Sequence, residues 1–258
     1  MQSSILEGNA INAPRGQWVN VYIPHPDEVP MTFQVGIVGT DGVLLASDRR
    51  YTHYQPGGYR TGACSSKIIW DGGNIACCSS GTQWAADAAM YCINRTLDSN
   101  IRRHIEAGCR NALEACGRLN QDPERFQGSV MLAYRQNGLT ELWFSDVRAV
   151  FLQEGIIEAS PARRVLNRQY AGDAGNSAVF FLEKYLVSGV SSPIDSLKFI
   201  AAHAVLMAGK LNPAGVEGLE ILLCRHGAAF ERVPDAELME LAAESDSLDS
   251  EMLNRLLP

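Results

Sequence analysis

Two successive hairpin signals between residues 33 and 79 constrain the fold of this chain more than any other feature of its sequence. Each consists of two short, mostly apolar runs joined by a glycine-containing turn. The runs and turns are residues 33–38, Asp41-Gly42 and 43–46, followed by residues 65–70, Asp71-Gly72-Gly73 and 74–79. Runs of this length around Asp-Gly and Gly-Gly turns are typical of antiparallel β-hairpins. We therefore expect hairpins at both places.

Four residues stand at fixed places around these hairpins. Thr32 directly precedes the first strand, Asp48 follows the second, Lys67 lies early in the next hairpin, and Gly81 ends that hairpin before a helical pattern. Thr32 is the most informative of them. A threonine at the first position of a chain carries both a hydroxyl nucleophile and an α-amine, and the amine pKa near 8 suits it to take the hydroxyl proton.

This set resembles, residue by residue, the β-type subunits of the proteasome family, which are N-terminal-nucleophile hydrolases. In that family a first-residue threonine starts a strand, an aspartate follows the hairpin, a lysine opens the next strand and a glycine precedes a helix. Thr32, Asp48, Lys67 and Gly81 match this order. Bacterial stand-alone members related to HslV-like peptidases look closer to this chain than the eukaryotic subunits. The segment between Asp48 and Lys67 is longer than the family's and is expected near the substrate.

The resemblance implies a threonine endopeptidase and gives each matching residue a role. The Thr32 hydroxyl would attack a peptide carbonyl, with its α-amine or a bridging water moving the proton, and water would then hydrolyse the acyl-enzyme. Lys67 would favour loss of that proton, or accept it if burial lowers its pKa, and Asp48 would hold Lys67. The backbone N–H of Gly81 would point at the oxyanion. The residues expected to contact substrate are Thr52, Ser79 and Ser80.

Two supporting positions of the family differ here. Asp173 stands where the family has a serine in a glycine-rich turn, and Lys210 or Asn212 occupies the neighbourhood of a family aspartate. One hypothesis is that acid and base have exchanged places, with Asp173 and Lys210 facing each other across the site. The alternative is that Asp173 caps the following helix and Lys210 is a solvated helix terminus.

The order of the other predicted elements supports an α+β class and the four-layer α/β/β/α sandwich that the resemblance implies. Two helix pairs are predicted, and a buried stripe is expected on the first helix at Trp84, Ala85, Ala88, Ala89 and Cys92. The predicted helices are residues 83–104, 105–119, 177–187 and 195–208, and an acid-rich amphipathic helix at 235–257. Gly108 and Gly117 are expected to be weak points of the first pair. The predicted strands are residues 129–135, 141–144, 150–153, 156–158, 217–225 and 228–232.

Residues 1–31 are expected to be an N-terminal extension that the mature protein lacks. They contain four prolines and show neither periodicity nor a signal-peptide pattern. We expect Met31 to be the true start, so that removal of this methionine exposes Thr32; a self-cleaved propeptide is the alternative. Residues 32–258 are then a single peptidase domain of ordinary size.

Composition excludes several classes of protein. With 46% hydrophobic and 20% charged residues and a net charge of −7, the chain is predicted to be globular, without a nucleic-acid surface or a membrane span. Its seven cysteines form no Cys-x-x-Cys pair, which favours a reducing cytoplasm. Adjacent Cys77 and Cys78 are expected to point to opposite faces of a strand. We expect no cofactor and no metal site.

The resemblance implies polypeptide substrates, a homo-oligomer of stacked rings of six or seven subunits, and an unfoldase ATPase partner for folded substrates. Two other functions stay open at this point. One is an amidase of the same fold that acts on a small amide. The other is a catalytically inert ring subunit, which the missing serine and aspartate favour and which Thr32, Asp48, Lys67 and Gly81 argue against. The acids of residues 235–257 are most simply a solvated helix face.

Overall fold

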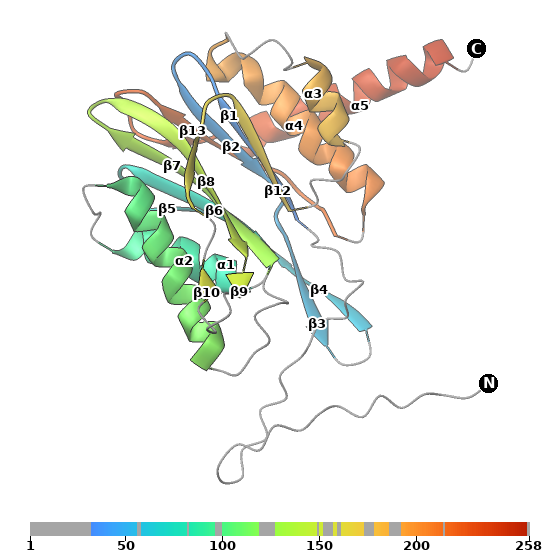
Figure 1. Ribbon diagram of the computed structural model, residues 1–258. Coiled ribbons are helices and arrows are strands. Elements are labelled where there is room, and N and C mark those ends of the chain that lie inside the picture. The colour runs from blue at the N-terminus through green and yellow to red at the C-terminus, as the bar shows by residue number, and fades with distance from the viewer. Residues whose placement is uncertain are drawn as a thin grey trace, which may run out of the picture.

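Two five-stranded antiparallel sheets form the centre of the protein (Figure 1). This computed structural model describes residues 32–55, 58–81, 83–95, 100–118, 127–148, 150–151, 157–158, 161–172, 178–185, 192–213 and 215–256. In spatial order the first sheet contains β12 (Arg168–Gly172), β1 (Phe33–Val38), β2 (Gly42–Ser47), β13 (Glu220–Arg225) and β14 (Glu231–Arg232). The second contains β11 (Arg163–Val165), β8 (Leu139–Arg148), β7 (Gln127–Gln136), β6 (Ile75–Gly81) and β5 (Ile68–Trp70).

The two hairpins predicted near the start are confirmed, and they lie in different sheets. β1 pairs with β2 so that Val38 faces Val43, and β5 pairs with β6 with Ile68 facing Cys78. The second hairpin turns at Asp71, whose carboxylate accepts the backbone N–H groups of Gly73 and Ile75. The first hairpin therefore places Thr32 and Asp48 at the ends of two neighbouring strands, and the second places Lys67 directly before β5.

Three hydrophobic cores hold the sheets and helices together. One lies between the sheets and includes Leu45, Cys78 and Met131, all fully buried. Gly36 permits the close approach there, because a Cβ at this position would lie 2.5 Å from the Met131 sulfur. The other two cores lie under helices: α3 (Ala178–Tyr185), α4 (Ile194–Leu211) and α5 (Asp235–Leu256) cover the first sheet, and α1 (Gln83–Asn94) and α2 (Ile101–Arg118) cover the second.

Cys77 and Cys78 confirm the expected alternation along β6. Cys77 belongs to the core under α1 and α2, whereas Cys78 belongs to the core between the sheets. The predicted stripe of α1 is also observed, with Ala85, Ala88, Ala89 and Cys92 fully buried; the side chain of Trp84 lies outside the described part. The α+β class is confirmed by this mixture of antiparallel sheets and separate helices.

Helix boundaries in the first pair differ from the prediction. α1 ends at Asn94 and α2 begins at Ile101, so His104 lies within α2 instead of ending a helix. Gly108, expected to be a weak point, lies inside α2 because the two helices touch there: a Cβ at this position would be 3.0 Å from both the Ala88 carbonyl oxygen and the Cys92 sulfur.

Several strands were not predicted. The segment after Asp48 forms a two-stranded ribbon, β3 (Arg50–Gln55) and β4 (Gly58–Cys64), which projects from the body of the protein in Figure 1. β11 and β12 follow the short pair β9 (Val150–Phe151) and β10 (Ile157–Glu158). β12 pairs with β1 and so becomes an edge of the first sheet.

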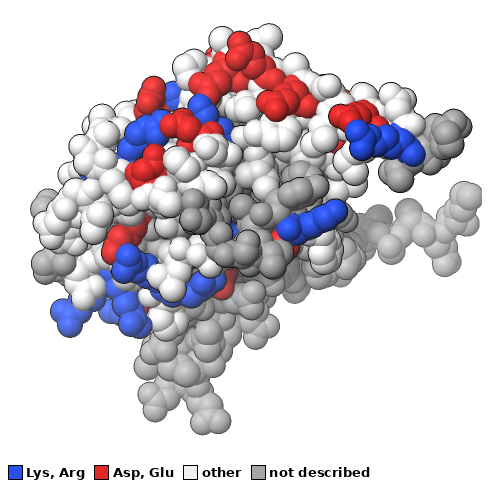
Figure 2. Space-filling view, turned by 90° about the horizontal axis from the view of Figure 1, so that it is seen from above, with Lys and Arg blue, Asp and Glu red and all other residues white. Residues whose placement is uncertain are grey.

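The acid-rich C-terminal helix is confirmed as α5, with a solvated acidic face. Leu238, Leu241 and Ser245 face the protein and are buried. Figure 2 shows acidic side chains in a band across this side of the molecule, and those exposed on α5 include Glu240, Glu244, Asp246 and Glu251. No helix in the described ranges is long and apolar enough to cross a membrane.

Candidate active site

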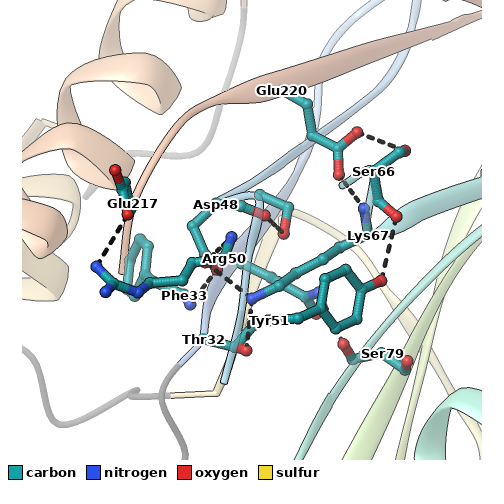
Figure 3. Close-up of polar contacts among 12 residues, drawn as sticks. Thr32, Phe33, Asp48, Arg50, Tyr51, Ser66, Lys67, Ser79, Glu217 and Glu220 are labelled. Atoms are coloured by element: carbon teal, nitrogen blue, oxygen red, sulfur yellow. Dashed lines mark hydrogen bonds and ion pairs between the residues drawn. The ribbon is translucent and has the colours of Figure 1, made fainter. Parts of the chain in front are cut away.

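Lys67 is the centre of a buried polar cluster at the ends of β1 and β2 (Figure 3). Its Nζ donates to the Oγ1 of Thr32 and to the Oδ2 of Asp48, at 2.8 Å each. The side chains of Lys67 and Asp48 are 4% and 0% exposed, so this ion pair is shielded from water. Three residues far apart in the sequence thus meet through direct hydrogen bonds.

Asp48 is oriented by the hairpin that it follows. β2 ends at Ser47, and the Asp48 N–H donates to the carbonyl of Phe33 across the hairpin. In return its Oδ1 accepts the Phe33 N–H at 3.0 Å, and its Oδ2 accepts the Arg50 N–H at 3.0 Å. These bonds fix the carboxylate beside the first residues of β1, and Oδ2 accepts from Lys67 Nζ as well as from the Arg50 N–H.

Burial pushes both members of this ion pair toward their neutral forms. Desolvation lowers the pKa of Lys67, although the charge and hydrogen bond of Asp48 oppose the shift. Desolvation likewise raises the pKa of Asp48, against the effects of Lys67 and of the two backbone N–H donors. A lysine in this setting releases its proton more readily than one in water, and so it can exchange a proton with a neighbouring hydroxyl.

Besides the bond of its side chain to Lys67, Thr32 has its backbone close to Gly172. Gly172, the last residue of β12, pairs with Phe33 and has a φ of +81°. A Cβ at Gly172 would lie 1.9 Å from the carbonyl oxygen of Thr32, so only glycine permits this approach.

Sequence reasoning missed two residues that enclose Lys67. The Tyr51 ring lies 5.4 Å from Lys67 Nζ and its hydroxyl donates to the Ser66 carbonyl. Glu220, at the start of β13, accepts the backbone N–H of Lys67 with its side chain. Tyr51 belongs to the ribbon whose strands were not predicted, and no local pattern in the sequence pairs Glu220 with Lys67.

The three residues predicted to contact substrate have different surroundings in the structure. Ser80 is buried, and its hydroxyl lies 2.7 Å from that of Ser129 between the sheets, so it is already engaged inside the protein. Ser79 is partly exposed, and its carbonyl accepts a hydrogen bond from the buried Gln34 side chain. Thr52 pairs with Thr61 in the ribbon, and its side chain lies outside the described part.

Gly81 occupies the predicted place between strand and helix. It is the last residue of β6, is exposed, and has a φ of +98°. α1 begins two residues later, at Gln83. Asp173 lies outside the described residues.

The hypothesis that Lys210 faces the site is wrong. Its Nζ donates to Asp246, at 2.8 Å, and to Asp249, and both acids belong to α5. Lys210 is half-exposed in the last turn of α4, where two carboxylates and the helix dipole stabilise its charge. The alternative, that Lys210 belongs to a solvated helix terminus, is the one that agrees with the structure.

The chemistry available to this cluster is that of a hydroxyl nucleophile beside a lysine with a lowered pKa. Within the described residues, no group of three or more His, Cys, Asp or Glu side chains is placed to hold a metal ion. Thr32 Oγ1 is the one nucleophilic atom bonded to Lys67 Nζ among the contacts of the cluster.

Solved structures with the same fold include Anbu proteins from three bacteria. The structure of the helical assembly of the Anbu complex from Pseudomonas aeruginosa matches with a TM-score of 0.63 and 16% identity, covering 88% of this chain and 97% of that one. Anbu from Yersinia bercovieri, described as an ancestral beta-subunit, matches with a TM-score of 0.62 and 12% identity over 88% of this chain and 98% of that chain. An Anbu mutant from Hyphomicrobium sp. strain MC1 gives 0.61 and 13%, over 86% and 96% of the two chains.

These likenesses correct the expected relationship to HslV-like peptidases, because the matching structures named here are Anbu proteins. At 12% to 16% identity they show a shared fold and leave the chemistry to be argued from this chain's own residues. No family model and no curated protein matches the sequence.

Proposed function

We propose that this chain is a proteasome-like N-terminal-nucleophile hydrolase subunit that cleaves peptide bonds with Thr32. The observation that carries the proposal is the position of Lys67 Nζ, 2.8 Å from both Thr32 Oγ1 and Asp48 Oδ2 in a buried setting. The likeness to Anbu, one of which is described as an ancestral beta-subunit, supports the fold that this chemistry needs. We further propose that the three cores correspond to the four-layer α/β/β/α arrangement of such hydrolases.

The reaction requires Thr32 to be the first residue, so we propose that residues 1–31 are absent from the active form and residues 32–258 are the peptidase domain. The freed α-amine, or Lys67, accepts the proton of the Thr32 hydroxyl as Oγ1 attacks the carbonyl carbon. The tetrahedral intermediate collapses to an ester on Thr32 while the leaving amine takes a proton, and water then hydrolyses the ester.

Three other residues complete the proposed site. Asp48 keeps Lys67 directed at Oγ1 through its ion pair. The N–H of Gly81, at the strand-to-helix turn, is proposed to stabilise the oxyanion, and Ser79 is proposed to contact the substrate. Each role is a proposal that rests on the position of the residue next to the cluster or at the end of β6.

We also propose that the subunit acts on polypeptides as a homo-oligomer in the cytoplasm. Six cysteines in the described part of the chain are free thiols, which supports a reducing compartment. The Pseudomonas aeruginosa Anbu was solved as a helical assembly. Electron microscopy of this protein would distinguish closed stacked rings from an open helix, and closed rings are the arrangement that sequesters the threonines.

The test uses protein produced from Met31, in which removal of methionine leaves Thr32 first. The protein is treated with a peptide epoxyketone, which forms its ring adduct only with an adjacent hydroxyl and free amine, and its mass is measured. We expect one adduct per chain and cleavage of a fluorogenic peptide. Thr32→Ala should abolish both, whereas Thr40→Ala, in the exposed turn between β1 and β2, should leave both intact.

Two results would contradict the proposal. A chain that begins at Thr32 and takes no adduct lacks a competent nucleophile, and peptide cleavage that survives Thr32→Ala belongs to another residue. Adduct formation without cleavage of any peptide would instead assign the site to a small amide.

A further inference from the structure

We propose that Glu220 is a second positioning residue for Lys67, which it holds by the backbone while Asp48 holds the side chain. The inference deepens the proposed function and rests on it, because it concerns the same lysine. Glu220 lies at the start of β13, and its Cα pairs with that of Ser47, the residue before Asp48. The two carboxylates therefore come from neighbouring strands and reach the same lysine from different sides.

The contacts of Glu220 are almost all to the segment that carries Lys67 (Figure 3). Its Oε1 accepts the backbone N–H groups of Lys67, at 2.5 Å, and Ile68, at 2.9 Å. Its Oε2 accepts the Ser66 hydroxyl at 2.7 Å. The Glu220 side chain is only 6% exposed, so a charged group has been buried at this place. Burial of a charge is costly unless several hydrogen bonds compensate it, as they do here.

We call the bonds of Glu220 to the backbone N–H groups of Lys67 and Ile68 the backbone clamp. The position of β5 explains why it is needed. β5 is a strand of three residues at the edge of the second sheet, with β6 as its neighbour. An edge strand has backbone N–H groups without a strand partner on one side. Glu220 fills that side at Lys67 and Ile68 with a carboxylate that comes from the first sheet. The ion pair at Thr32 is consequently built on a segment that the two sheets hold jointly.

Arg232 balances the charge of Glu220. Its Nη1 donates to Glu220 Oε2 at 2.8 Å, and its Nη2 donates to the Ser66 hydroxyl at 2.9 Å. Charges along the network thus alternate from Arg232 to Glu220, Lys67 and Asp48. The negative charge of Glu220 raises the pKa of Lys67, as does that of Asp48, and both oppose the larger lowering by burial. Arg232 limits the influence of Glu220.

This alternation makes opposite predictions for two single substitutions. Glu220→Gln removes a negative charge and should move the titration of Lys67 to lower pH. Arg232→Gln removes a positive charge and should move it to higher pH. A shift of roughly half a pH unit or more is expected for removal of a unit charge near the titrating nitrogen in a partly shielded site. A purely structural role would give no such reversal of sign.

The experiment is a pH titration by NMR of the chain from Met31, labelled with ¹³C at lysine Cε, and of both variants. The chain has four lysines, so four signals are expected, and Lys67→Arg assigns one of them. Lys198 and Lys210, whose carboxylate partners lie on α4 and α5, serve as internal controls that should not move. The pH profile of kcat/KM for a fluorogenic peptide should shift in the same direction as the Lys67 signal.

Opposite shifts in the two variants support the inference. Equal titrations in all three proteins, or shifts of the same sign, overturn it. If Glu220→Gln fails to fold, Arg232→Gln decides alone. Arg232 is 40% exposed, and its removal takes away its own bond to the Ile68 carbonyl but leaves the bonds of Glu220 to the Lys67 and Ile68 N–H groups in place. Failure of the proposed function would show separately, as absence of the epoxyketone adduct on the unsubstituted chain, and the lysine titration would still test the clamp.

Discussion

Replacing Lys67 by methionine would leave the Asp48 carboxylate fully buried without its cation. Methionine has a similar length and no charge, so the change removes the ion pair and keeps most of the packing. Removing one partner of a buried pair typically costs about 3–5 kcal/mol. Asp48 keeps the N–H donors of Phe33 and Arg50 in the variant, which places the expected loss at the lower end, about 3 kcal/mol at neutral pH.

The sign of the pH dependence follows from Asp48. Burial already raises its pKa in the native protein, and loss of the Lys67 ammonium raises it further. A carboxyl with a raised pKa in the folded state stabilises the fold below its unfolded pKa, and this contribution is lost as the pH rises. The destabilisation by Lys67→Met should therefore be small near pH 4 and grow toward neutral pH, by at most ~1.4 kcal/mol per pH unit.

The measurement is urea unfolding followed by tryptophan fluorescence, at about pH 4.5 and about pH 7.5 and at one fixed protein concentration. Lys67→Met/Asp48→Asn should abolish the pH dependence, because no carboxyl remains at the site. Lys198→Met, which removes a partly exposed lysine paired with Asp195 and Glu237, should cost less than about 1 kcal/mol. A loss below about 1 kcal/mol for Lys67→Met at neutral pH, or the same loss at both pH values, would refute the reasoning.

Two further predictions concern the edge of the site and the α4–α5 contact. Gly172→Ala should displace Thr32, because the new Cβ would lie 1.9 Å from the Thr32 carbonyl oxygen and the φ of this residue is positive. We expect loss of epoxyketone labelling with an unchanged far-UV circular dichroism spectrum; normal labelling would contradict this reasoning. Burial lowers the pKa of His203, whose Nδ1 lies 2.7 Å from Ser245 Oγ. The charge of Lys210 lowers this pKa further, and the carboxylate of Asp249 opposes the shift. A base with a lowered folded-state pKa costs stability as the pH falls below about 6.5, so His203→Gln should flatten the decline of Tm between pH 7.5 and 5.5, and an unchanged decline would count against it.

The part of the site that local sequence patterns encode was predictable. Asp41-Gly42 and Asp71-Gly72-Gly73 set the turns of two hairpins, and a hairpin's turn fixes which residues face each other. The turn of β1 and β2 therefore places Asp48 beside Phe33, next to Thr32. The contact of Lys67 with this pair needed the two sheets to pack face to face, and the resemblance to a known family supplied that expectation.

Features created by packing between distant segments were not predictable in this way. Gly108 was expected to weaken a helix, but its missing side chain serves the contact between α1 and α2. One of the two hypotheses placed Lys210 near the site, but the acids that bind it lie on a helix 36 and 39 residues further along the chain. Glu220 carries no local signal for its role, because its partners in the Lys67 segment are 152 to 154 residues away.

The long sequence distance between Glu220 and Lys67 also bears on the order in which the protein becomes competent. Contacts between residues 153 apart form only after a large loop has closed, and β13 is synthesised after β1, β2 and β12 of its own sheet. Until β13 joins the first sheet, the edge of β5 lacks its carboxylate and the Lys67 backbone is not fixed. In a nascent or partly unfolded chain, Thr32 is therefore present while the position of Lys67 is not yet fixed. The clamp that orders the site also delays its completion until most of the protein has folded.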